Sequence, residues 1–90
     1  MYEQLTVWDE LVEQARELPA KRLRLLAGML SHLALLEDDH LVRVGVVARR
    51  EKTAATKRHA EPQAAGWGNL LDACLIEYLR RHPRPAMIAP

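Results

Sequence analysis

The residues with the clearest capacity for chemistry are basic, and they lie close together in the middle of the chain. Six arginines and lysines stand within segment 43–59: Arg43, Arg49, Arg50, Lys52, Lys57 and Arg58. The only acids within the segment or just after it are Glu51 and Glu61. Because guanidinium groups bind paired oxygens, the segment predicts contact with an acidic surface of a protein or nucleoprotein complex, or directly with DNA or RNA phosphates. The alternative is a solvated helix face whose charges are balanced by acids of the N-terminal segment.

Two other chemistries have weaker support in the sequence. Glu37 and His40 have the Glu-x-x-His spacing that carboxylate-bridged metal sites use on helices, but such sites need a second copy and further glutamates. Metal binding at this pair is kept only as an alternative, and no cofactor is expected. Ser31 and Cys74 have no histidine placed to activate them, and Cys74 stands among leucines. The chain is therefore predicted to be non-enzymatic.

Apolar residues recur at three- and four-residue spacing, which is typical of amphipathic helices. The pattern predicts helices over 2–18 and 20–37, with the second the most buried of the bundle. It predicts a further helix over 69–82, with Asn69 as its N-cap and the glycine-rich stretch 66–68 in the preceding loop. These helices have to position the basic segment.

Segment 41–48 is ambiguous from the sequence. Its valines alternate as in a strand, and a strand paired across a dimer is one interpretation. A helix would place Leu41, Val44, Ala48 and Ala55 on one side. On the other side it would place Arg43, Arg50 and Lys57, seven residues apart, in one stripe. The helix is preferred, because valines in a helix cost only tenths of a kcal/mol each, whereas an unpaired strand leaves a row of backbone groups without partners.

Together these segments predict an all-α fold. We expect a small bundle of about four helices that forms a single domain over 1–83, followed by a short Pro-rich extended tail over 84–90. A domain of this size has a thin core that a partner chain would stabilise, so a homodimer is kept as an alternative. Residues 1–42 carry eight acids and four bases, and residues 43–90 carry four acids and nine bases. Such halves either fold against each other or offer a partner two different faces.

Compartment and source are indicated by composition. The single cysteine cannot form an internal disulfide, and the N-terminus shows no basic start followed by an apolar block, so a cytoplasmic protein is expected. The most apolar run, 23–36, is too short and too polar to span a bilayer, so no membrane contact is expected. Ten arginines against three lysines indicate codons rich in G and C, which suggests a bacterial or phage source. The predicted function is a small regulator, inhibitor or accessory subunit that works by binding.

Overall fold

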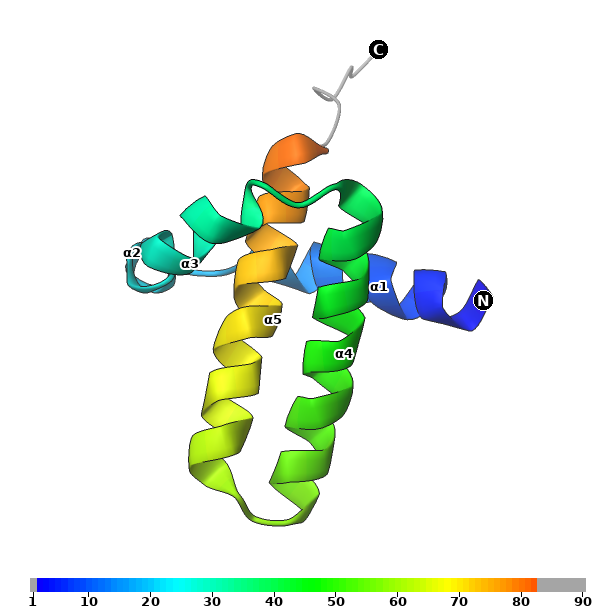
Figure 1. Cartoon of the computed structure of the whole chain (residues 1–90), viewed down its shortest axis with the longest axis vertical. Helices are drawn as coiled ribbons and strands as arrows, with labels where there is room; N and C mark the ends of the chain where they lie inside the picture. Colours follow the sequence, from blue (N-terminus) through cyan, green and yellow to red (C-terminus); the bar gives the residue numbers. More distant parts are fainter. Residues whose placement is uncertain (1, 83–90) are drawn as a thin grey trace.

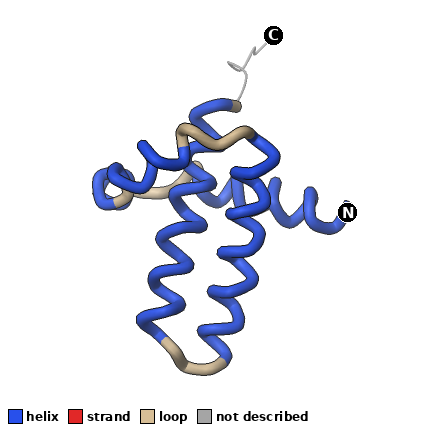
Figure 2. The backbone as a smooth tube through the Cα atoms, viewed as in Figure 1, coloured by secondary structure: helices blue, strands red, loops and turns tan. Residues whose placement is uncertain are grey.

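The regular structure of residues 2–82, which the computed structural model describes, is entirely α-helical (Figures 1 and 2). In chain order the helices are α1 (Tyr2–Ala15), α2 (Ala20–Leu25), α3 (Ala27–Leu33), α4 (Asp38–Lys57) and α5 (Glu61–Arg81). The predicted all-α fold is confirmed, and segment 41–48 lies inside α4, so the alternative of a strand is wrong. No helix in this part of the chain has the length and apolar character that crossing a bilayer requires. The predicted tail over 84–90 lies outside the described residues.

The framework is an antiparallel hairpin of the two long helices, α4 and α5 (Figure 1). α4 ends in a Schellman motif, in which the amide of His59 donates to the carbonyl of Thr56 at 3.0 Å. The amide of Ala60 completes the motif by donating to the carbonyl of Ala55 at 2.8 Å. His59 adopts the left-handed conformation that this motif requires, with a φ of 58°. Pro62 then lies in the first turn of α5, where its missing N–H is tolerated, so the chain reverses over a short turn.

α5 begins at Glu61 and not at Asn69, so the predicted N-cap and loop are wrong. Gly66 and Gly68 lie inside the helix, where each costs about 1 kcal/mol relative to alanine. At Gly68, packing against α4 offsets this cost. Gly68 is buried under the aliphatic part of Lys52, whose Cε lies 3.4 Å from the position that an added Cβ would take. The helix extends this far because α4 supports it, and local sequence does not reveal that support.

Segment 20–37 forms two short helices, α2 and α3, so the described chain has five helices where a bundle of about four was predicted. The helix is interrupted at Leu26, whose amide lies 3.2 Å from the carbonyls of both Arg22 and Leu23. The break brings Leu26 into the core, where it is 1% exposed. None of the residues of α2 is buried, and Leu33 alone is buried in α3. The prediction that this segment is the most buried is therefore wrong, because the α4/α5 hairpin supplies most of the core.

α1 crosses the hairpin (Figure 1). One of its large side chains, Trp8, lies between the elements. Trp8 is 1% exposed, and its ring makes a T-shaped contact with Tyr78 at a centroid distance of 5.5 Å. The indole reaches α4 at Gly45, where an added Cβ would lie 2.6 Å from Cη2 of Trp8. Beside Gly45, burial raises the pKa of the Cys74 thiol to about 12, so this thiol is protonated and unreactive in the folded chain. Both Trp8 and Cys74 therefore belong to the core.

Bases at the end of α5 connect three elements of the fold. Glu77 is 2% exposed, and its carboxylate accepts hydrogen bonds from Arg80 Nη2 at 2.6 Å and from Arg81 Nε at 2.7 Å. Arg81 also donates to Asp38 at 2.9 Å and to the carbonyl of Leu33 at 3.1 Å. The last contact occupies a carbonyl at the end of α3, where a cation is favoured. We call this set of contacts the Arg81 clamp, because it holds the ends of α3 and α5 to the start of α4.

Acid is expected to weaken the Arg81 clamp. Hydrogen bonds from Arg81 and His82 hold the pKa of Asp38 below its ordinary value, and those from Arg80 and Arg81 lower the pKa of Glu77 despite its burial. A carboxyl whose folded pKa is lowered contributes stability above its unfolded pKa of about 4, and this stability is lost as the pH falls through the folded value. We expect the urea concentration at the midpoint of unfolding to decrease when the pH is lowered below about 4.

The test compares wild type with Asp38→Asn over the acid range. The variant lacks one of the two titrating carboxyls, so its urea midpoint should decline less steeply with falling pH than that of wild type. Identical acid slopes for the two proteins would show that Asp38 contributes no pH-dependent stability.

Candidate functional site

The six bases predicted as the site are all exposed, on α4 or at the first residue after it. They are Arg43, Arg49, Arg50, Lys52, Lys57 and Arg58. None of the six side chains forms an ion pair or hydrogen bond within the part of the chain that the structure describes. The proposed balancing of these charges by acids of the N-terminal segment is therefore not seen as direct pairing among the side chains that the structure describes. We call this set the α4 basic face.

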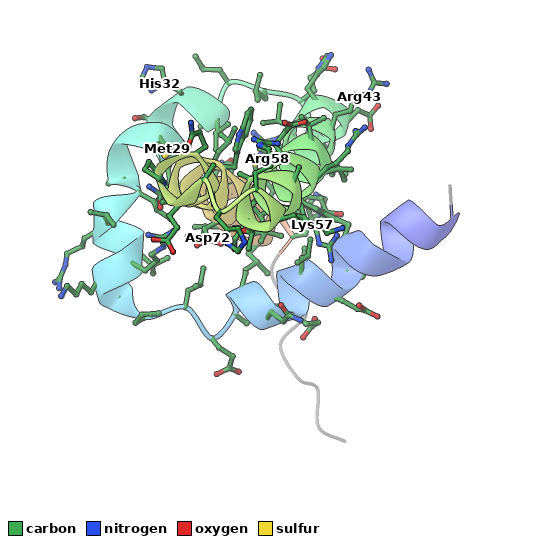
Figure 3. The ribbon with its side chains drawn as sticks, turned by 90° about the horizontal axis from the view of Figure 1, so that it is seen from below. Met29, His32, Arg43, Lys57, Arg58 and Asp72 are labelled. Atoms are coloured by element: carbon green, nitrogen blue, oxygen red, sulfur yellow. The ribbon has the colours of Figure 1, made fainter. Side chains whose placement is uncertain are left out.

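The side chains of the α4 basic face leave the helix in different directions. Positions 43 and 50 are seven residues apart and lie opposite the buried Leu41 and Ala48. Figure 3, which views the hairpin from below, shows Arg43 pointing away from both hairpin helices. Lys57 instead lies on the side of α4 that faces α1. The six bases therefore do not form one continuous stripe.

Three of the bases, Arg49, Lys52 and Lys57, converge on a groove where α1 crosses α4. The groove has a volume of about 410 Å³. Its other lining residues are Leu11, Thr53, Thr56 and Leu71. Leu11 comes from α1 and is half-buried, while Leu71 comes from α5 and is 4% exposed. An apolar floor therefore lies beside basic side chains in what we call the α1/α4 groove.

Hydrogen bonding leaves the α1/α4 groove rich in donors. The hydroxyl of Thr53 donates to the carbonyl of Arg49 at 3.0 Å, and that of Thr56 donates to the carbonyl of Lys52 at 2.9 Å. Both hydroxyl protons are thus engaged within α4. The side chains of Arg49, Lys52 and Lys57 carry donors and no acceptor. A ligand that fits this groove has to supply acceptors, and carboxylates and phosphates are the acceptors that also carry the complementary charge.

Comparisons of the chain with protein-family models, curated proteins and solved structures find no match. The function is therefore inferred from the charge and shape of the chain itself. Two properties define the surface: six cations without an acidic partner among the described residues, and an apolar floor beside three of them.

Glu37 and His40, the pair with metal-site spacing, are both exposed at the start of α4. Among residues 2–82, no group of three or more histidine, cysteine, aspartate or glutamate side chains is placed to hold a metal ion. Asp38, between the two, is engaged in the Arg81 clamp. The geometry gives the metal alternative no further support.

Sequence reasoning found the bases of the α1/α4 groove but missed its other lining residues. Thr53 and Thr56 follow Arg49 and Lys52 by four positions, so helical periodicity carries a signal that could have placed them on the same side of α4. Leu11 and Leu71 lie in the apolar stripes of α1 and α5, and nothing in their spacing separates a groove floor from ordinary core. Only the crossing of α1 over the hairpin brings them to this surface.

Proposed function

We propose that this chain is a non-catalytic binding protein that holds an acidic surface of another protein, alone or within a nucleoprotein complex, through the α4 basic face. The observation that carries the proposal is six exposed cations with no acidic partner among the described residues. A cytoplasmic regulator, inhibitor or accessory subunit would work in this way.

The contrast with other arginines of the chain supports this proposal. Arg22 pairs with Asp72 at 2.9 Å and joins α2 to α5, and Arg81 lies at the centre of the clamp described above. The fold thus pairs the arginines that connect its elements. Isolated exposed charges contribute little to stability, so the fold itself does not require the α4 basic face. A concentration of unpaired cations along one helix does, however, steer and orient an acidic partner.

A second candidate is direct binding of DNA or RNA by the same face. The outward positions of Arg43 and Arg50 favour it, because α4 from Arg43 to Lys57 extends over about 21 Å, enough to follow several phosphates. Against it, no described residue that lines the groove is aromatic, so the stacking platform typical of single-strand binding is missing there.

A charge-reversal experiment tests the proposal. Fluorescein-labelled poly-L-glutamate serves as the acidic probe, and fluorescence anisotropy measures its binding to the purified chain at low and near-physiological salt. We expect wild type to bind and the double variant Arg49→Glu/Lys57→Glu to lose affinity by about tenfold or more, because two attractive charges become repulsive. Labelled duplex and single-stranded DNA are measured in parallel.

The matched control is Lys21→Glu/Arg24→Glu, which changes the net charge by the same amount at two exposed bases of α2. This control should keep most of the affinity, since its charges lie away from α4. Equal losses in the two double variants would mean that only net charge matters, and the proposal would fail. Tighter binding of DNA than of poly-L-glutamate at near-physiological salt would favour the second candidate.

A further inference from the structure

The α1/α4 groove differs from the rest of the α4 basic face in having an apolar floor. Arg43 and Arg50 project into solvent, whereas Arg49, Lys52 and Lys57 border a hollow that reaches down to Leu71. A purely polar ligand would satisfy the cations and leave this floor in contact with water. A ligand with apolar side chains as well would also bury the floor, which is favourable.

We propose that the α1/α4 groove binds an acidic amphipathic segment of a partner protein. Its carboxylates lie on Arg49, Lys52 and Lys57, and at least one of its apolar side chains lies on Leu11 and Leu71. This inference rests on the proposed function, because it uses the same basic residues and adds the chemistry of the occupant. Helices with charged and apolar residues at three- and four-residue spacing are a recurrent occupant of such grooves.

Charge complementarity favours an occupant with negative charge. The described side chains around the groove include two lysines and one arginine and no acid. The hydroxyls of Thr53 and Thr56 already donate within α4, so charged donors dominate the groove wall. A basic segment would be repelled by these cations and a neutral segment would leave their charge uncompensated, whereas glutamate or aspartate carboxylates would pair with them.

The apolar floor decides between a protein segment and nucleic acid. Phosphates and sugars present no large aliphatic group to Leu11 and Leu71, and bases stack best on aromatic rings. No aromatic residue is among the described residues that line the groove. The side chains of leucine, isoleucine, valine or methionine fit this floor. An acidic amphipathic segment carries such side chains together with carboxylates.

Two synthetic peptides of equal length and charge provide the test. Both are fluorescein-labelled, about sixteen residues long, and contain the same number of glutamates at the same positions. In the first, leucines occupy every third or fourth position, and in the second, serines replace these leucines. We expect the leucine peptide to bind the wild-type chain about tenfold more tightly than the serine peptide, because only the first can cover the groove floor.

The outcomes separate this inference from the proposed function. Equal affinity of the two peptides, with loss of both in Arg49→Glu/Lys57→Glu, would overturn the inference and leave the proposed function standing. No binding of either peptide, and none of poly-L-glutamate, would overturn both. Tighter binding of a duplex DNA than of the leucine peptide at near-physiological salt would also overturn the inference.

Location is tested without any change to the chain. One leucine of the first peptide is replaced by photo-leucine, and the cross-linked residues of the wild-type chain are identified by mass spectrometry. We expect cross-links to Leu11, Thr53 and Thr56 around the groove. Cross-links at the exposed Leu25 and Leu35 instead would place the peptide on another apolar surface and contradict the inference.

Discussion

Gly45→Ala is expected to lower the free energy of unfolding by about 1–3 kcal/mol, a large effect for the addition of one methyl group. The added Cβ would lie 2.6 Å from Cη2 of Trp8 and 3.3 Å from Cβ of Cys74, and the indole is rigid and fully buried. α1 would have to move away from the hairpin to relieve this overlap. Urea denaturation followed by circular dichroism measures the change.

The matched control is Gly66→Ala in α5. The space around an added Cβ at Gly66 is open within 4 Å, so the substitution should raise the free energy of unfolding by about 0.5–1 kcal/mol through helix propensity alone. Because both substitutions replace a helical glycine by alanine, their difference reports the contact with Trp8. In a Trp8→Phe background, Gly45→Ala should cost less, since the smaller ring leaves room. Equal effects of Gly45→Ala and Gly66→Ala would show that the close approach of α1 to α4 is wrong.

Arg81→Met is expected to lower the free energy of unfolding by about 1–2 kcal/mol, after allowance for solvent near Asp38. The guanidinium of Arg81 donates to Glu77, Asp38 and the carbonyls of Leu33 and Ala34, and its side chain is 16% exposed. Methionine keeps most of the apolar stem, so the loss reports the polar contacts. Thermal and urea unfolding both measure it.

Arg80→Met provides the comparison for this second variant. Arg80 also binds Glu77, but its side chain is 65% exposed and makes no other hydrogen bond within the described chain. In each variant Glu77 keeps one arginine partner, so the difference between them isolates the links of Arg81 to Asp38 and α3. A loss in Arg80→Met as large as in Arg81→Met would mean that these links do not hold the elements together.

Much of the fold could be predicted from apolar periodicity. The helical state of 41–48 followed from the cost of an unpaired strand, and the apolar residues Leu41 and Ala48 are indeed buried on one side of α4. The start of α5 could not be predicted, because Gly66 and Gly68 are poor helix formers and the packing at Gly68 comes from Lys52 on another helix. Tertiary contacts override local preference at this point.

The site was predictable in its charges and not in its shape. Sequence alone shows that Lys52, Lys57 and the arginines of segment 43–59 are clustered. It does not show which of them meet at one hollow, because that depends on where α1 crosses α4. The burial of segment 20–37 was overpredicted for a related reason: an apolar stripe shows that a helix has an apolar face, and Leu25 and Leu35 remain exposed on it in the folded chain.

The central claim is that the α4 basic face, and within it the α1/α4 groove, is the binding surface of this protein. Heteronuclear NMR of the ¹⁵N-labelled chain tests it most directly, by titration with the unlabelled leucine peptide at near-physiological salt. We expect the amide shifts to change in α4 around Arg49, Lys52 and Lys57 and at Leu11 of α1, and to stay unchanged around Lys21 and Arg24. Shifts spread evenly over all exposed bases, or no shifts at all, would contradict the claim.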